Sequence, residues 1–214
     1  MELINLYPGS FGSNCYVLLS DGHAAVIDPS ANASTVLDTV SSHGAVLDFI
    51  LLTHGHFDHI MSLDDLRDGS GAPALIHASD AELLPDAQKN AFYYFFQKEN
   101  AYRPAERTLE NGEELILGST HIKVIHTPGH TRGSVCYLCD GDTLLTGDTL
   151  FASGFGRFDL YGGDARTLFC SLSSLRSLPG ELMIYPGHGE SATLGQALDR
   201  LPQRIFDSDF SERM

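Results

Sequence analysis

The segment that decides the fold reads Leu51-Leu52-Thr53-His54-Gly55-His56-Phe57-Asp58-His59. Its first residues are apolar, as in a buried strand, and its last residues form a glycine-containing turn that presents histidine and aspartate side chains. The same pattern returns at 124–130, 144–148 and 183–188. Ligands bind at strand ends in folds that mix helices and strands, because rigid strands fix the loops that expose side chains. The sequence therefore predicts that four strand ends converge on one edge of the fold.

The regular structure around this segment is expected to mix short strands with helices. Apolar, β-branched runs predict strands at 15–20, 24–28, 46–53, 74–77, 113–117, 121–126, 134–139, 142–147 and 181–185. Helices are expected near 33–43, 59–68, 164–178 and 193–200. Several strands are apolar throughout, which indicates sheets covered on both faces. The fold class that follows is a layered α/β arrangement.

Length and composition favour one globular unit. The chain has 214 residues, of which 43% are hydrophobic and 19% charged, so it is neither disordered nor a coiled coil nor collagen-like. Strand-rich stretches at 1–53 and 108–147 are each followed by helices. We expect a single domain over 1–214 built from two pseudo-symmetric halves, approximately 1–107 and 108–214. Chance recurrence in an α/β protein is the alternative explanation of this rhythm.

The charge of the chain limits its partners. The net charge is −15, and the only lysines are Lys89, Lys98 and Lys123, so a nucleic acid or an anionic membrane is not an expected partner. The start of the chain has no basic segment, and no apolar run approaches the roughly 18 to 20 residues of a membrane span. We expect a soluble, cytoplasmic protein with a small-molecule substrate.

Histidine and aspartate, rather than cysteine, are the candidate metal ligands. Four cysteines are too few for a disulfide framework. Cys136 and Cys139 have no second pair to complete a four-thiolate zinc site, so we expect both to pack in a strand. Ten histidines are an unusual number, and neutral imidazole and carboxylate donors suit zinc, manganese and iron. A dense set of these donors without cysteine argues against a purely structural zinc site.

These residues resemble the signature of the metallo-β-lactamase superfamily and, within it, of the glyoxalase II-like (hydroxyacylglutathione hydrolase-like) hydrolases. The signature is H-x-H-x-D-H followed by a distant His, a distant Asp and a final His. Here it is matched by His54, His56, Asp58, His59, His130, Asp148 and His188. The resemblance implies that His54, His56 and His130 hold one metal ion, that Asp58, His59 and His188 hold a second, and that Asp148 bridges them. The other five histidines are expected to be ordinary core or surface residues.

The resemblance also implies a fold and a reaction. The fold is a four-layer αβ/βα sandwich, with two mixed sheets flanked by helices and the metals at one edge. Two divalent ions, with zinc expected and iron or manganese as alternatives, lower the pKa of a bridging water toward roughly 7. The resulting hydroxide, oriented by Asp58, would attack a thioester of a small acid. A thioester is favoured because a thiol of pKa near 8.5 leaves without a proton donor.

A second motif concerns the substrate. Residues 151–159, which include Gly156 and Arg157, resemble the loop of glyoxalase II-like and persulfide dioxygenase-like members in which a basic residue approaches the carboxylate of a thiol substrate. Arg157 is therefore a candidate contact for a carboxylate-bearing thioester, and a structural ion pair with Asp159 or Asp164 is the alternative. Glyoxalase II proper has a tyrosine at the position of Asp159 and a C-terminal helical domain, whereas 26 residues follow His188 here. The cationic glutathione contacts of that domain are not expected.

Five consecutive aromatic residues, at 92–96, lie within the segment 86–105. They cannot all face one side of a helix, so some are expected to be exposed or to cover a site. One interpretation is a lid or substrate wall. The other is a contact with the core or with a second copy of the chain in a homodimer.

Two other functions are compatible with the same ligands. The first is a mononuclear-iron oxidoreductase resembling the persulfide dioxygenases, whose loop reads G-R-x-D as residues 156–159 do here. The second is a non-catalytic metal-binding interaction protein, which the complete set of seven ligands disfavours. Flavin-dependent diiron members usually place Glu where His56 stands, and nuclease members add a basic surface, so both are set aside.

Overall fold

The first sheet forms from the short apolar runs of the N-terminal half. The computed structural model describes residues 1–6 and 12–206. Its first six strands lie side by side in chain order: β1 (Glu2–Asn5), β2 (Tyr16–Ser20), β3 (His23–Ile27), β4 (Val46–Leu51), β5 (Ala74–His77) and β6 (Arg107–Leu109). Strands β1 to β3 are antiparallel, and β3 to β6 are parallel. The parallel strands therefore end at one common edge.

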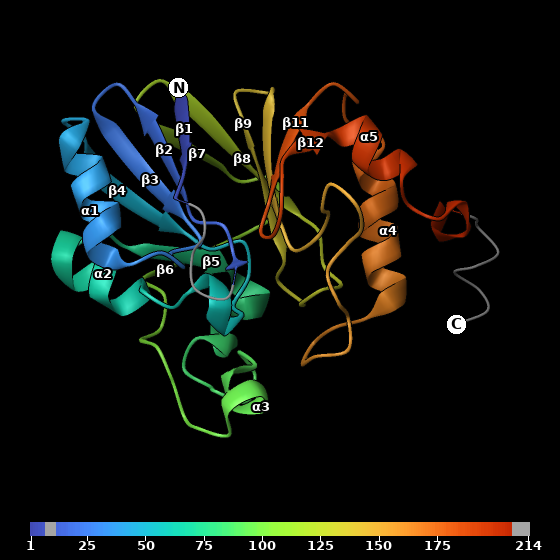
Figure 1. The fold of residues 1–214 in the computed structure, drawn as a ribbon, viewed down its shortest axis with the longest axis horizontal. Helices are drawn as coiled ribbons and strands as arrows, with labels where there is room; N and C mark the ends of the chain where they lie inside the picture. Colours follow the sequence, from blue (N-terminus) through green and yellow to red (C-terminus); the bar gives the residue numbers. More distant parts are fainter. Residues whose placement is uncertain (7–11, 207–214) are drawn as a thin grey trace.

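The second sheet forms from the C-terminal half and packs against the first (Figure 1). Its strands are β7 (Glu114–Leu117), β8 (Thr120–His126), β9 (Val135–Cys139), β10 (Thr143–Gly147), β11 (Met183–Pro186) and β12 (Ala192–Thr193), in the spatial order β12-β11-β10-β9-β8-β7. Neighbours are antiparallel except β10 and β11, which are parallel. Strands β8, β10 and β11 consequently run in one direction and end at the same edge.

Helices cover the outer faces of both sheets. Helices α1 (Ala33–Ser42) and α2 (Leu63–Ser70) lie on the first sheet, α4 (Ala165–Leu175) and α5 (Leu194–Asp199) lie on the second, and the short α3 (Phe92–Phe96) projects from the fold (Figure 1). The side chain of Asp164 caps α4 by accepting a hydrogen bond from the backbone N–H of Thr167. Within residues 1–6 and 12–206, no helix combines the length and apolar character that crossing a bilayer requires.

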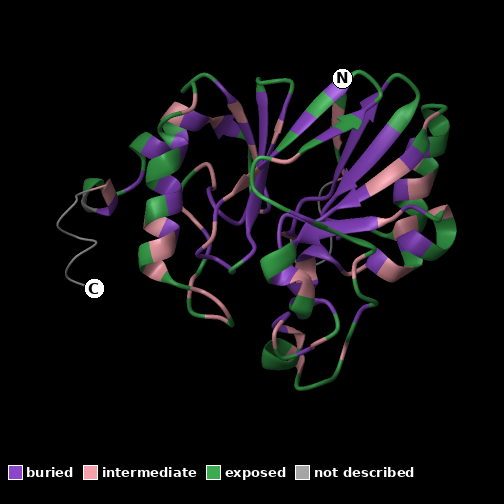
Figure 2. Cartoon of the chain, turned by 180° about the vertical axis from the view of Figure 1, so that it is seen from behind, coloured by how far each residue is buried: buried purple, intermediate pink, exposed green. Residues whose placement is uncertain are grey.

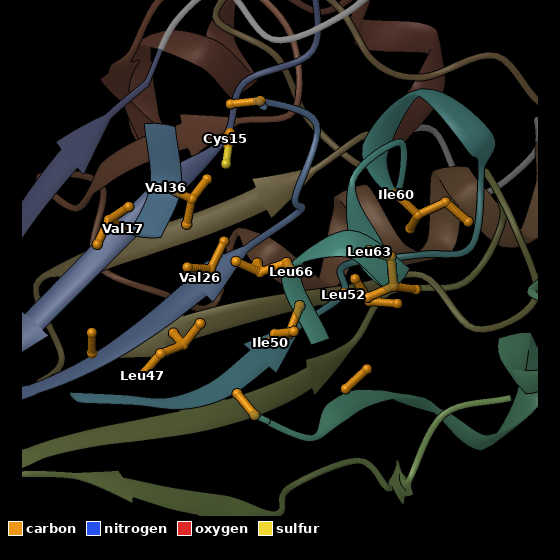
Figure 3. Close-up of a cluster of buried hydrophobic side chains, with 14 of the residues drawn as sticks. Cys15, Val17, Val26, Val36, Leu47, Ile50, Leu52, Ile60, Leu63 and Leu66 are labelled. Atoms are coloured by element: carbon orange, nitrogen blue, oxygen red, sulfur yellow. The ribbon is translucent and has the colours of Figure 1, made fainter. Parts of the chain in front are cut away.

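Three buried apolar clusters lie between these layers. One fills the space between the first sheet and α1 and α2 (Figure 3), a second lies between the two sheets, and a third lies between the second sheet and α4 and α5. Strand β2 shows the alternation that this requires, because Val17 belongs to the first cluster and Leu18 to the second. Figure 2 shows the strands largely buried and the helices exposed on their outer sides. The four-layer αβ/βα sandwich expected from the sequence is confirmed.

The structure differs from the predicted elements where segments are short. Strands β1, β6 and β12 have two to four residues each and were not predicted, because so few positions carry no clear alternation. The helix predicted over 59–68 begins only at Leu63, since Phe57–His59 forms a separate 3-10 turn. Cys136 and Cys139 pack in β9 as expected, on opposite faces of the sheet.

The two sheets share part of their layout. In β1–β4, and again in β8–β11, two antiparallel pairings are followed by a parallel one, and α1 or α4 makes the parallel crossover. Strand β6 ends at Leu109, so the first sheet extends just past the boundary expected near residue 107. A single domain with two related halves stays a prediction.

Candidate metal centre

Seven histidine and aspartate side chains gather at the edge where the parallel strands of both sheets end. The loop after β4 supplies four of them, and the loops after β8, β10 and β11 supply one each: His54, His56, Asp58 and His59, then His130, Asp148 and His188. The first three histidines and His130 are at most 4% exposed, Asp148 is buried, and Asp58 and His188 are half-buried. The structure thus brings together all seven residues that the sequence singled out.

The first ligand set consists of His54, His56 and His130. The Nδ1 atom of His56 lies 2.8 Å from Nε2 of His130, and that Nε2 lies 3.2 Å from Nε2 of His54. All three candidate donor atoms fall within 4.8 Å of one another. Three imidazole nitrogens therefore face a common point in the protein interior.

The second ligand set consists of Asp58, His59 and His188. The Nε2 atoms of the two histidines are 3.3 Å apart, and Nε2 of His188 lies 3.2 Å from Oδ2 of Asp58. These donor atoms too lie within 4.8 Å of one another. The second set opens toward the surface, because two of its three members are half-buried.

Asp148 lies between the two sets. Its Oδ2 atom is 3.6 Å from Nε2 of His130 in the first set and 3.6 Å from Nε2 of His188 in the second. Its Oδ1 atom is 3.4 Å from Nε2 of His59. The carboxylate therefore lies close to the ligand nitrogens of both sets.

Burial and neighbouring charges set the protonation of the histidines. Burial, reinforced by neighbouring histidines, lowers the pKa of His54 well below its usual value and that of His56 to about 3. Burial acts in the same direction on His59, but the Asp148 and Asp58 carboxylates outweigh it and raise the pKa of His59 well above its usual value. In the metal-free protein at pH 7, His54 and His56 are therefore neutral while His59 holds a proton.

The donor set fits divalent metal ions. Burial raises the pKa of Asp58 and Asp148, but the charge of His59 outweighs it, so the pKa of each is lowered and both are ionised at pH 7. The Oδ1 atom of Asp148 is buried without a hydrogen-bond partner, a cost that a cation would offset. At Gly187 a Cβ atom would collide with this Oδ1 and lie 2.6 Å from Cε1 of His59. The charge of this donor set thus matches a metal ion, and the absence of a side chain at Gly187 leaves room for the two ligand side chains.

Hydrogen bonds from the far side of the rings orient two of the ligands. His130 donates from Nδ1 to the backbone carbonyl of Arg157 at 2.6 Å, and His188 donates from Nδ1 to the carbonyl of Gly12 at 3.2 Å. Each Nε2 lone pair is left facing the centre.

Asp28 orients a third ligand and was not singled out from the sequence. Its Oδ2 atom accepts hydrogen bonds from Nδ1 of His59 at 2.9 Å and from Oγ1 of Thr53 at 2.6 Å, and its Oδ1 atom accepts one from the Thr53 N–H at 2.8 Å. The residue is 2% exposed and follows β3 directly. The apolar run Val26-Ile27 before it repeats the pattern of the four ligand segments, which is the signal that could have revealed it.

Asp80 ties two ligand loops together and was also missed. It is fully buried, and it accepts hydrogen bonds from the Gly55 N–H at 3.1 Å, from Oγ1 of Thr131 at 2.7 Å and from the Gly133 N–H at 2.6 Å. Gly55 lies between His54 and His56, and Thr131 follows His130. Nothing in the local sequence distinguishes Asp80, because its partners lie 25 to 53 residues away.

A cleft of about 520 Å³ opens onto both ligand sets. Its floor contains members of each set, and its walls are mainly apolar: Phe57, Ala91, Phe95, Phe96, Phe151 and Leu160. The aromatic segment 92–96 therefore forms part of the wall, as one of the two interpretations of this segment requires. The contact with a second copy of the chain stays a prediction.

Arg157 lies on the rim of the cleft and is already paired. Its Nε and Nη2 atoms donate to the two carboxylate oxygens of Asp159 at 2.7 and 2.8 Å. Its guanidinium carbon lies 5.9 Å from the ring centroids of Tyr94 and Phe95. The ion pair with Asp159 is thus formed, whereas Asp164 caps α4 instead. The Nη1 edge is the part of Arg157 that this pairing leaves for a ligand.

Comparison with known proteins agrees with this geometry. The family model of the metallo-β-lactamase superfamily matches residues 8–188. The chain therefore belongs to the metallo-β-lactamase superfamily. Among its relatives, the probable metallo-hydrolase YqgX of Bacillus subtilis is 35% identical over 91% of this chain and 93% of its own length. A hydroxyacylglutathione hydrolase of Rhodospirillum rubrum is 32% identical over 88% of this chain and 67% of its own length.

Solved structures show the same fold. The BLEG-1 B3 metallo-β-lactamase superposes with a TM-score of 0.88 and 33% identity, covering 94% of this chain and 98% of that one. TTHA1623, solved in a di-iron-bound form, superposes with a TM-score of 0.79 and 32% identity, covering 93% of this chain and 98% of that one. ETHE1 from Myxococcus xanthus superposes with a TM-score of 0.77 and 27% identity, covering 99% of this chain and 89% of that one. The chain is thus a metallo-hydrolase-family protein with a dinuclear type of metal site.

Proposed function

We propose that the protein is a hydrolase that cleaves a thioester of a small acid at a dinuclear metal centre. The observation that carries the proposal is the pair of ligand sets that share Asp148 at the floor of one cleft. The similarity to a hydroxyacylglutathione hydrolase supports the reaction class. Zinc is the proposed metal, and iron or manganese would suit the same donors.

The chain's own residues would divide the work as follows. His54, His56 and His130 would hold one ion, Asp58, His59 and His188 the other, and Asp148 would contact both. Two such ions, when bound, would polarise the carbonyl of the substrate and lower the pKa of a bound water. Asp58 is ionised and half-buried at the cleft, so its carboxylate can accept a hydrogen bond from the attacking water and orient it.

The lining of the cleft favours a leaving group that needs no proton donor. Among the described residues that line it, Arg157 is the one titratable group other than Asp148 and the members of the two ligand sets. A thiol of pKa near 8.5 leaves as the thiolate, whereas an amine leaving group requires a general acid. Water would add to the carbonyl carbon and the C–S bond would break, giving a carboxylate, a thiol and one proton.

Arg157 is the proposed contact for a carboxylate on the substrate. Asp159 holds two of its nitrogens and thereby fixes the plane of the guanidinium, so Nη1 can donate to a carboxylate at the rim. The cleft and its floor would then hold the thioester itself.

Thiol release tests the proposed reaction. Purified protein loaded with zinc should release thiol from S-lactoylglutathione or from simpler thioesters, and His56→Ala should not. His23→Ala is a matched control, because His23 is exposed and pairs with Asp48 outside the site. Turnover by the wild type no faster than by His56→Ala would refute the proposal.

A mononuclear-iron dioxygenase acting on a persulfide is the second candidate. The loop Gly156-Arg157-Phe158-Asp159 and the similarity to ETHE1 support it in part. Metal analysis of protein purified without added metal separates the two functions. One iron per chain with oxygen uptake on glutathione persulfide would select the dioxygenase, and two metal ions per chain with thiol release would select the hydrolase.

A further inference from the structure

The aromatic helix α3 rests directly on the metal-binding loop. Phe57 lies between His56 and Asp58, and its ring centroid is 5.6 Å from that of Phe92, 5.4 Å from that of Phe95 and 5.5 Å from that of Phe96. The backbone N–H of Phe57 also donates to the carbonyl of Asn90 at 2.9 Å. The position of α3 is therefore set by the same loop that carries four of the ligands.

The backbone around α3 is held in a costly conformation. Ala91, just before the helix, has a φ of 68°, and Gln97, just after it, has a φ of 53°. Non-glycine residues adopt this left-handed region only at a cost in free energy. Such strain is characteristic of functional sites, and here it places Phe95 and Phe96 on the wall of the cleft.

The apolar wall is accessible to a ligand. Phe95 is 50% exposed although it faces the cleft. Phe151 and Leu160, from the loop after β10, complete the apolar lining. Exposed apolar surface that is gathered in one place is characteristic of a binding site.

The charge of the cleft argues in the same direction. Its lining offers one cation, Arg157, whose charge is offset by Asp159. Outside the ligands and Arg157, the side chains that line the cleft are apolar. Most of the space above the ligand sets is therefore suited to an uncharged, apolar group.

We propose that the wall formed by Phe57, Phe95, Phe96 and Phe151 binds the acyl part of the substrate, and that the small acid is apolar, with an aromatic or medium-chain acyl group. The proposal rests on the thioester hydrolysis proposed above. Phe95 and Phe96 are then specificity-determining residues, because they are the members of the wall that α3 contributes. The wall would favour such a group over lactoyl, which exposes a hydroxyl to it.

A series of thioesters of one uncharged thiol, N-acetylcysteamine, isolates the acyl group. We expect kcat/KM to rise at least about ten-fold from acetyl or lactoyl to hexanoyl and phenylacetyl, since each buried methylene contributes about four-fold. Phe96→Ala and Phe95→Ala should each remove most of this preference. Tyr93→Ala is the matched control, because Tyr93 lies on the same helix but does not line the cleft, and it should keep the preference.

Calorimetry with an uncleavable thioether supplies a readout that does not depend on turnover. A phenethyl thioether of N-acetylcysteamine should bind at least about ten-fold more tightly than the methyl thioether, with a negative heat-capacity change. Metal content should be unchanged in Phe95→Ala and Phe96→Ala, which excludes damage to the ligand loop. If the wild type cleaves thioesters without regard to acyl size, or if both variants keep the preference, the acyl-site proposal is wrong. If no thioester is cleaved but the phenethyl thioether binds selectively, the proposed reaction fails and the apolar site stands.

Discussion

The Oδ2 atom of Asp28 accepts a hydrogen bond from Nδ1 of His59 at 2.9 Å, with both side chains buried. This bond turns Nε2 of His59 toward His188 and Asp148. Asp28 comes from the end of β3 and His59 from the loop after β4, so neighbouring strands of one sheet cooperate in placing a single ligand.

Asp28→Asn should weaken the second ligand set more than the first. Loss of an acceptor behind a ligating histidine typically costs about 10- to 100-fold in metal affinity. We expect zinc content to fall from two ions per chain toward one. Asp48→Asn is the control, since it removes the carboxylate of an exposed Asp–His pair that lies outside the site. Equal zinc content in the two variants would contradict this role of Asp28.

Asp80→Ala should destabilise the metal-free protein and loosen the first ligand set. The substitution leaves the N–H groups of Gly55 and Gly133 and the hydroxyl of Thr131 without their buried acceptor. The free energy of unfolding should fall by about 3 kcal/mol, measured by urea unfolding. Zinc affinity should fall as well, because the loops of His54 and His130 lose their link. Asp38→Ala, at an exposed aspartate of α1, should change neither quantity.

Gly187→Ala should abolish metal loading without unfolding the chain. The added methyl group would occupy the place of the Asp148 carboxylate and crowd His59. Overpacking of this kind costs about 1–3 kcal/mol, so the protein should fold but bind zinc poorly. Gly180→Ala is the control, as the nearest atom to its added Cβ is 3.7 Å away. Normal zinc content in Gly187→Ala would show that metal binding does not need the Asp148 carboxylate in its present position.

The metal-free protein should lose stability on acidification through His56. Burial lowers the pKa of His56 in the folded state to about 3, whereas the unfolded chain takes up a proton near the usual value of 6.5. Proton uptake by the unfolded chain favours unfolding, so this contribution is complete above pH 6.5 and is lost as the pH falls toward 3. Melting temperatures of chelator-treated protein at pH 7.5 and 5 measure the loss. The His56→Gln variant lacks the stabilisation that His56 provides above pH 6.5, but it keeps His59, whose raised pKa acts in the opposite direction. An equal fall in melting temperature in the wild type and in His56→Gln would count against the explanation.

Arg157→Gln should raise KM for thioesters that carry a carboxylate on the thiol by about ten-fold and leave kcat nearly unchanged. Thioesters of N-acetylcysteamine, which has no carboxylate, should show no such effect. Arg103→Gln changes an exposed arginine that pairs with Asp64 and Asp68 away from the cleft, and it serves as the control. A KM increase of equal size for both kinds of thiol would mean that Arg157 acts by holding the cleft wall instead.

Much of the centre could be predicted from the sequence because each ligand follows its own strand. The run Leu51-Leu52 before His54, and the similar runs before His130, Asp148 and His188, mark strand ends, and parallel strands bring their ends to one edge. The layered fold follows from the same runs, since apolar strands require cover on both faces.

The residues behind the ligands could not be predicted in this way. Asp80 acts through partners that only the packing of the two sheets brings near it, and its own neighbours in the sequence are unremarkable for the short 3-10 helix Ala78–Leu83 in which it lies. Arg157 illustrates a different limit, because a sequence shows that a carboxylate is near in the chain but not which nitrogen edge it occupies. Short strands such as β6 form because a neighbouring strand offers hydrogen bonds, and three residues carry no pattern of their own.

Each ligand set draws on both sheets. His56 and His130 are 74 residues apart, and His59 and His188 are 129 apart. An ion bound by either set would close a loop of that length, as a disulfide bond does, and a covalent cross-link closing about 100 residues removes about 4–5 kcal/mol of unfolded-state entropy. Metal ions would thus add a link between two sheets that already pack through the apolar cluster between them and through hydrogen bonds such as that from the Tyr137 hydroxyl to the Leu52 carbonyl. The supply of metal in a cell would then govern how long the folded chain survives proteolysis, and not only how fast it turns over substrate.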